Sequence, residues 1–96
     1  MKRSNQFSLG EAIRDFLEAY DLEDKLLEKE VIGYWEEVVG AVINKHTRKV
    51  WIKNRKLYAR VDSPVVRNEL TYSREKIRQA LNRMIKKELI VEIVIR

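Results

Sequence analysis

The middle of the chain carries two short runs in which apolar and polar residues alternate, separated by only two residues. Residues 49–53 are Lys-Val-Trp-Ile-Lys and residues 56–62 are Lys-Leu-Tyr-Ala-Arg-Val-Asp, with Asn54 and Arg55 between them. Alternation with a period of two places successive side chains on opposite faces of a strand, and a two-residue connection suits a hairpin. Asn54 tolerates the left-handed conformation that such a turn needs. The sequence therefore predicts a β-hairpin with one apolar face that the rest of the chain must cover.

Segments with helical periodicity precede the hairpin. Residues 8–11 have the Ser-x-x-Glu spacing of a capping box, in which the serine and glutamate side chains satisfy free N–H groups at a helix start. Apolar residues then recur at helical spacing, and we expect a first helix over residues 9–20. A second helix is expected from Leu22, bending around Gly33 and ending at Gly40, because glycine suits the position just after a helix.

Further elements complete the expected order. Residues 41–45 are expected to add one helical turn. Ser63 and Pro64 have the features of a helix start, a capping hydroxyl and a proline in the first turn. The apolar rhythm of this late helix weakens near residues 71–73, which leaves one helix or two. Residues 89–95 are apolar and rich in β-branched side chains, and they predict a third strand.

The predicted fold class is α+β, with the order α-α-β-β-α-β and one or two helices in the late helical stretch. Helices are expected to cover one face of a three-stranded sheet. Residues 9–96 should form a single domain after a short polar segment, residues 1–8. The residues expected to face the helices are Val50, Ile52, Leu57, Ala59, Val61, Val91, Ile93 and Ile95. Those expected on the opposite face are Lys49, Trp51, Lys53, Tyr58, Arg60, Glu92 and Val94.

Charge is divided unequally along the chain. Residues 1–40 hold 5 Lys/Arg and 10 Asp/Glu, a net charge of −5, whereas residues 41–96 hold 15 and 5, a net charge of +10. A basic surface favours polyanions, because neutralising phosphates releases condensed counterions. The alternative is a charged surface that only keeps a small domain in solution. The acidic opening helices would repel phosphate and suit a basic protein partner or a basic patch of the same domain.

The sequence offers little for catalysis or metal binding. There is no cysteine, so disulfides and thiolate metal sites are excluded, and residence in the cytoplasm is expected. No run is long enough to cross a membrane. His46 is the single histidine and lacks neighbouring ligands, and adjacent carboxylates such as Glu36 and Glu37 do not face one another on a helix. We expect no enzymatic activity, no metal and no cofactor.

Two groups of side chains are candidates for nucleic-acid binding. The first is the outward face of the hairpin, where aromatic rings among cations suit single strands, since rings stack bases and cations follow phosphates. Its members are Lys49, Trp51, Lys53, Tyr58 and Arg60, with Arg48, Arg55 and Lys56 at the ends. Alternatively, Trp51 and Tyr58 form a cross-strand pair under a helix or simply cover the sheet. The second group is Arg67, Arg74 and Arg78 at helical spacing on the late helix, which could equally be a solvated face.

A longer pattern resembles a known family. The run Trp-Glu-Glu-Val-Val-Gly at residues 35–40 is followed by Ile43, His46-Thr47, Leu57-x-x-x-Val61, Ser63, Glu69-Leu70, Leu81-Asn82 and Val91-x-Ile93. This pattern is similar to that of the DciA-type domain of bacterial helicase loaders, over almost the whole chain. Val66 stands where such proteins often have tryptophan, and the sequence shows almost none of the long basic extension that many members carry.

The resemblance implies a KH-like α+β fold, association with the replicative helicase, and affinity for single-stranded or forked DNA. It matches Trp35, Gly40, His46 and Thr47 to motif positions, which we interpret as structural residues of the core, the turn and the start of the hairpin. The chain lacks the G-x-x-G loop with which ordinary KH domains clamp a nucleic-acid backbone. The expected function is therefore a non-enzymatic, DNA-binding helper of helicase loading. An RNA-binding domain acting in ribosome or transcript handling and a protein–protein adaptor are the alternatives.

Overall fold

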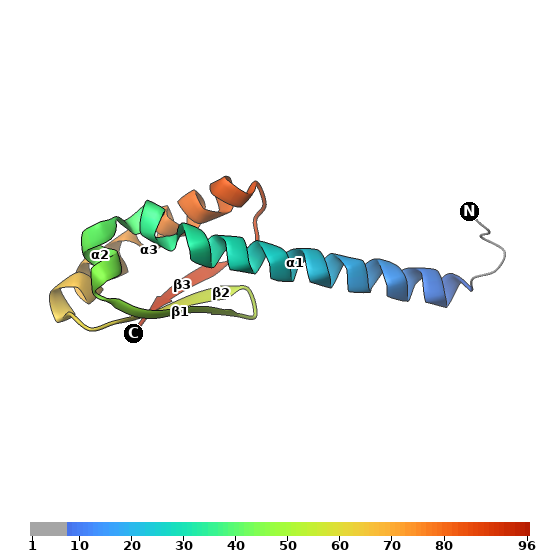
Figure 1. The fold of residues 1–96 in the computed structure, drawn as a ribbon, viewed down its shortest axis with the longest axis horizontal. Helices are drawn as coiled ribbons and strands as arrows, with labels where there is room; N and C mark the ends of the chain where they lie inside the picture. Colours follow the sequence, from blue (N-terminus) through green and yellow to red (C-terminus); the bar gives the residue numbers. More distant parts are fainter. Residues whose placement is uncertain (1–7) are drawn as a thin grey trace.

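The structure is a computed structural model that describes residues 8–96, apart from the side chains of residues 17, 20 and 21. Its elements are α1 (Leu9–Val39), α2 (Ala41–Lys45), β1 (Thr47–Lys53), β2 (Lys56–Val61), α3 (Pro64–Ile85) and β3 (Glu92–Ile95) (Figure 1). This confirms the predicted α+β class and the order of its elements. The predicted polar segment before the first helix lies outside the described residues, except for Ser8.

The first helix, α1, is continuous over 31 residues, and the predicted division near residue 21 is wrong. Ser8 caps it as expected, since its Oγ accepts a hydrogen bond of 3.1 Å from the Glu11 backbone N–H. Leu22 and Leu26 follow the expected end of the first helix at residue 20. Neither glycine nor proline stands there to interrupt the backbone, so the helix continues and the two leucines are exposed to solvent.

Gly40 ends α1 and starts the turn of α2. Its φ of 93° and ψ of 163° are a combination open almost only to glycine. The Gly40 backbone N–H donates a 2.7 Å hydrogen bond to the Glu36 carbonyl, which satisfies one of the last acceptors of α1. This glycine therefore lets the chain leave the long helix abruptly and turn back toward the sheet.

The sheet has the strand order β1-β2-β3, with β1 and β2 antiparallel and β2 and β3 parallel. The predicted hairpin is confirmed, and its turn places both Asn54 (φ 52°) and Arg55 (φ 64°) in the left-handed region. The third strand begins at Glu92 and not at residue 89. Leu89 and Ile90 are buried in the connection that precedes it, where Ile90 pairs with the Asn82 side chain and not with a strand.

The late helix, α3, is single and returns the chain from β2 to the parallel strand β3. Ser63 caps it as predicted, with its Oγ accepting from the Val66 N–H at 3.3 Å. The break that the sequence left open near residues 71–73 does not occur. The Thr71 hydroxyl donates to the Arg67 carbonyl one turn earlier at 2.8 Å, so the polar residues of this stretch stay within the helix.

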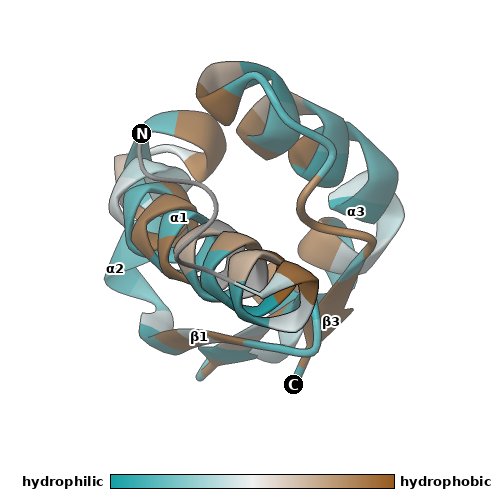
Figure 2. Cartoon of the chain, turned by 90° about the vertical axis from the view of Figure 1, so that its right-hand side faces the viewer, coloured by the Kyte–Doolittle hydropathy of each residue, from teal (hydrophilic) through white to brown (hydrophobic). Residues whose placement is uncertain are grey.

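Both long helices lie on one side of the sheet (Figure 2). The core between them holds Val31 and Trp35 of α1, residues of α3 and the covered side of the strands. Its buried members are Val31, Trp35, Leu57, Ala59, Val61, Leu70, Ile77, Leu81, Ile85, Leu89, Ile90 and Ile93. The predicted inward residues are buried or packed against this core, with one exception. Val91 is 51% exposed, because it lies before β3 and not within it.

Candidate nucleic-acid interface

The face of the sheet turned away from the helices carries the residues predicted for it. The pairing register places Trp51 opposite Tyr58, and Tyr58 opposite Val94. Since side chains alternate between faces, one face is shared by Lys49, Trp51, Lys53, Lys56, Tyr58, Arg60, Glu92, Val94 and Arg96. We call this set the open sheet face. Among residues 8–96, no helix covers it (Figure 2).

An aromatic pair occupies the middle of the open sheet face. The Trp51 and Tyr58 rings are stacked, with centroids 5.3 Å apart and planes inclined by 7°. The distance and angle suit an offset stacked pair. The cross-strand pair foreseen as an alternative is therefore present, but without the helix over it, and both rings are only partly buried. A pair of stacked rings from neighbouring strands is thus partly exposed at the surface.

Three cations lie over these rings. The Lys49 Nζ is 5.3 Å and the Arg60 guanidinium carbon 5.6 Å from the Trp51 ring centroid. The Arg96 guanidinium carbon is 5.1 Å from the Tyr58 centroid. Sequence reasoning missed Arg96, although the alternation of Glu92 and Val94 reaches it when continued by one step, and its backbone N–H and C=O pair with β2.

The open sheet face is strongly positive. Five of its members are Lys or Arg, and Glu92 is its one carboxylate. Glu92 lies 3.5 Å from the Lys56 Nζ, and this is the one ion pair between members of the face within the described part of the chain. Among the described residues, no ion pair joins a carboxylate of α1 to this face, and Asp24 of α1 binds Lys87 instead.

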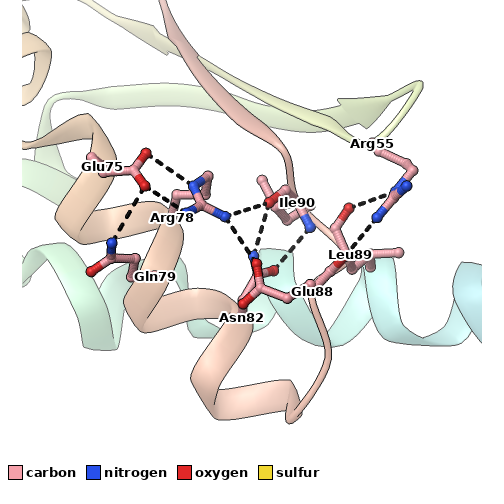
Figure 3. Close-up of polar contacts among 8 residues, drawn as sticks. All are labelled: Arg55, Glu75, Arg78, Gln79, Asn82, Glu88, Leu89 and Ile90. Carbon is pink, nitrogen blue, oxygen red and sulfur yellow. Dashed lines mark hydrogen bonds and ion pairs between the residues drawn. The ribbon is translucent and has the colours of Figure 1, made fainter.

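Two predicted cations at the ends of the hairpin are engaged elsewhere. Arg48 stands at an irregularity of the β1 register and forms an ion pair with Asp62. Arg55 donates from Nε to the Leu89 carbonyl at 3.0 Å and from Nη2 to the Glu88 carbonyl at 2.6 Å (Figure 3). These bonds hold the α3–β3 connection against the hairpin turn, so Arg55 acts in the described structure as a positioning residue for that connection.

The arginines of α3 lie on a different side of the molecule, because α3 packs on the covered face of the sheet. Arg67 donates to the Val61 carbonyl at 2.6 Å and Arg74 to the Thr71 carbonyl at 3.1 Å. Arg78, whose side chain is 18% exposed, binds Glu75, Glu88 and the Ile90 carbonyl (Figure 3). The hydrogen bond to Glu75, followed by that to Glu88, raises the pKa of Arg78, and the same partnership lowers the pKa of Glu75.

The residues of the family-like motif form the junction between α2 and the hairpin. Trp35 is buried, and its Nε1 donates to the Thr47 Oγ1 at 3.2 Å, while that hydroxyl donates to the Ile43 carbonyl at 2.9 Å. His46 Nδ1 lies 2.9 Å from Asp62 Oδ1. The hydrogen bond with His46, and then that with Arg48, holds the pKa of Asp62 below its ordinary value. These contacts fix the start of β1 against α1 and against the end of β2.

Other kinds of site are not found in the described residues. No group of three or more His, Cys, Asp or Glu side chains within them is placed to hold a metal ion. None of the helices in residues 8–96 is both long and apolar enough to span a membrane.

The fold and this surface define a small α+β domain with an open face that is both aromatic and basic. The chain belongs to the DciA family, because the family model described as "Dna[CI] antecedent, DciA" matches residues 8–95. This confirms the resemblance drawn from the motif residues. The family is one of helicase loaders and not a known catalytic family, which assigns the chain to helicase loading in DNA replication. No curated protein and no solved structure matches the chain, so the KH-like character of the fold stays a prediction.

Proposed function

We propose that the chain binds single-stranded or forked DNA on its open sheet face and that this contact helps the replicative helicase engage DNA. The observation that carries the proposal is the stacked pair of Trp51 and Tyr58 on an uncovered sheet face, with Lys49, Arg60 and Arg96 over the rings. Sequence-tolerant single-strand binding needs both components, a ring for each base and cations for the backbone. The family's part in helicase loading supplies the context for such a contact.

The energies favour exchange of the cations for bases. An exposed cation over an aromatic ring contributes about 0.5–1 kcal/mol, whereas a base stacked on such a ring contributes about 1–3 kcal/mol. Lys49, Arg60 and Arg96 are exposed, and the rotatable bonds of Lys and Arg side chains would let their charged groups move from the rings to phosphates. Incoming bases would then replace the cations on the ring faces, and the displaced cations would pair with the phosphates.

The geometry favours single strands over duplex. Trp51 and Tyr58 stand on adjacent strands, and such strands lie about 4.8 Å apart. Since the two rings stack on each other, incoming bases can stack only on the outer faces of the pair, which requires unpaired and separated bases, as in a single strand or at the open end of a fork. Stacking by itself does not distinguish DNA from RNA, since the bases of both have π faces, and the 2′-hydroxyl is the group by which a protein tells RNA from DNA.

The direct test measures binding of fluorescently labelled oligothymidine by anisotropy, using Trp51→Ala and the native chain. We expect the substitution to weaken single-strand binding by about 5- to 150-fold, the range that corresponds to one lost stacking partner, and to weaken duplex binding less. Tyr72→Ala on α3 is the matched control, because Tyr72 is an exposed aromatic residue away from the open sheet face. An equal loss for single strand and duplex would argue against stacking.

Two further measurements separate the alternatives. Competition between oligothymidine and oligouridine decides between the DNA and RNA functions. A clear preference for oligouridine would make RNA, and not DNA, the ligand of the open sheet face. The salt dependence of affinity reports how many phosphates are neutralised, and a slope near zero would favour the adaptor. Finally, helicase-dependent unwinding of a forked DNA should be stimulated by the native chain and less by Trp51→Ala.

A further inference from the structure

The last strand, β3, lies at an edge of the sheet. It pairs with β2 on one side, and no strand within residues 8–96 pairs with its other side. Arg96 uses both of its backbone groups toward β2, since its N–H donates to the Ala59 carbonyl and its carbonyl accepts from the Val61 N–H. Backbone groups alternate in direction along a strand, so Ile93 and Ile95 turn their N–H and C=O groups toward the outer edge. These two residues are therefore available to an incoming strand.

Helix α3 leaves this edge accessible. A groove of about 350 Å³ lies beside the start of β3, and its lining includes Thr71, Tyr72, Val91, Glu92 and Ile93. Two of its apolar side chains are open to solvent, since Tyr72 is 84% exposed and Val91 is 51% exposed. A strand laid along β3 can therefore reach the outward backbone groups and cover part of this apolar surface.

The two edges of the sheet differ in the features that discourage strand pairing. Lysine side chains, proline and β-bulges are common protections of an edge strand. The other edge strand, β1, carries Lys49 and Lys53, and its register shifts between Thr47 and Lys49. The sequence of β3 is Glu-Ile-Val-Ile, without lysine or proline, and its register with β2 is regular. The edge formed by β3 is therefore the one better suited to pairing.

The charges of β3 match those of a second, antiparallel β3 strand. Pairing through outward backbone groups places Ile93 of one copy opposite Ile95 of the other. In this register Val94 faces its own counterpart, and Glu92 of each copy faces Arg96 of the other copy on the open sheet face. Both charged side chains are exposed, so a second copy can reach them. The register that uses every outward group of Ile93 and Ile95 is thus also the one that brings opposite charges together.

We propose that two copies of the chain associate through β3, in antiparallel pairing centred on Val94, to form one continuous sheet. The outward backbone groups supply the contact, as in other additions of a strand to a sheet edge. The cross-strand pairs of Glu92 with Arg96 set the orientation and register. The twofold symmetry of such a pair places both open sheet faces on the same side of the joined sheet. The inference does not rest on DNA binding, although the two aromatic pairs would share one surface.

Sedimentation velocity of the full chain over a range of concentrations is the first test. We expect a dimer that dissociates on dilution. A monomer at every concentration up to about 1 mM would overturn the proposal, because an association weaker than that is not a specific interface. Trp51→Ala should retain the dimer, which separates this inference from the proposed DNA contact.

Charge exchange tests the register. Glu92→Arg places two cations opposite each other in the proposed pair, and Arg96→Glu places two carboxylates there. We expect each change to weaken self-association by at least about fivefold, while circular dichroism shows that the fold is kept. An equimolar mixture of the two variants should form a heterodimer, since every cross-strand pair then joins opposite charges. Lys53→Glu on β1 is the matched control for Arg96→Glu, because it changes the net charge equally, and it should leave self-association unchanged.

Two outcomes of these experiments would contradict the proposed strand pairing. One is a mixture of the charge variants that associates no better than either variant alone. The other is a dimer in which amide hydrogen exchange at Ile93 and Ile95 is independent of protein concentration. In the proposed dimer these two amides exchange more slowly as the concentration rises, whereas the Arg96 amide, which is already bonded to Ala59, changes less.

Discussion

The side chain of Asn82 in α3 pairs with both backbone groups of Ile90. Its Nδ2 donates to the Ile90 carbonyl at 2.8 Å, and its Oδ1 accepts from the Ile90 N–H at 2.9 Å (Figure 3). Asn82 is 2% exposed and is the one buried polar side chain of the described residues. A residue of the connection thereby obtains the two hydrogen bonds that a neighbouring strand would otherwise give it, and β3 starts two residues later.

Replacing Asn82 should therefore destabilise the fold. Asn82→Leu keeps a similar volume but leaves the Ile90 N–H without a partner in a buried position and weakens the pairing of its carbonyl. We expect the free energy of unfolding to fall by about 2–4 kcal/mol, measured by chemical denaturation followed by circular dichroism. Asn68→Leu is an exposed change on the same helix and should shift it by about 0.5 kcal/mol or less. Similar effects of the two changes would contradict the assigned role.

The open sheet face should account for most of the salt dependence of DNA binding. Lys49→Glu combined with Arg60→Glu removes two cations from the Trp51 ring and adds two negative charges. We expect a large loss of oligothymidine affinity and a salt slope that is smaller by about two phosphate contacts. Arg74→Glu, on the side of α3, is the control and should reduce affinity much less. A greater loss from Arg74→Glu would move the interface to α3.

Arg67 should matter for stability more than for binding. Its Nη1 donates to the carbonyl of Val61, the last residue of β2, from a partly buried position. Arg67→Ala leaves that carbonyl without its charged donor and is expected to lower the free energy of unfolding by about 1–3 kcal/mol. Arg74→Ala, where the bond lies at the surface, should change it by about 0.5 kcal/mol or less. Thermal unfolding of both variants distinguishes the two roles.

Replacement by alanine should change stability in opposite directions at Gly33, inside α1, and at Gly40, just after it. Gly40→Ala forces a side chain onto a φ of 93° and ψ of 163° and should cost about 1–3 kcal/mol of stability. Gly33→Ala, inside the helix, should add about 0.5–1 kcal/mol. In neither case does the added Cβ meet another atom within 4 Å, so the difference isolates the backbone conformation. Unfolding midpoints of the two variants provide the measurement.

The acid stability of the chain should depend on Asp62. Its pKa is lowered below the ordinary 3.8 by the hydrogen bond with His46 and then by Arg48, so folding favours the charged carboxylate. A lowered pKa contributes stability that is present above the ordinary value and is lost as pH falls through the folded value. Melting temperatures of the native chain should therefore drop below about pH 4, and those of Asp62→Asn should drop less. Glu69→Gln, an exposed change on α3, should leave the native pH dependence in place.

Much of the local structure could be predicted from the sequence. Alternation on either side of Asn54 and Arg55 predicts the hairpin, and Ser8, Ser63 and Gly40 mark helix ends that the structure confirms. These signals succeed because capping hydroxyls, turn conformations and strand faces depend on residues close together in the chain. The pairing of Trp51 with Tyr58 follows for the same reason, since a two-residue turn sets the register of its hairpin.

The tertiary structure decided which charged groups are available. Spacing alone placed Arg67 and Arg78 in a basic row, but Val61, Glu75 and Glu88 become their partners only when α3 packs against the end of β2 and the connection to β3. The continuity of α1 was also not evident from the sequence, because the helix runs on past residue 20 with Leu22 and Leu26 exposed to solvent. Local sequence sets hydrogen bonds within a helix or hairpin, whereas contacts between distant segments depend on how the elements pack, and these contacts separated the open sheet face from the arginines of α3.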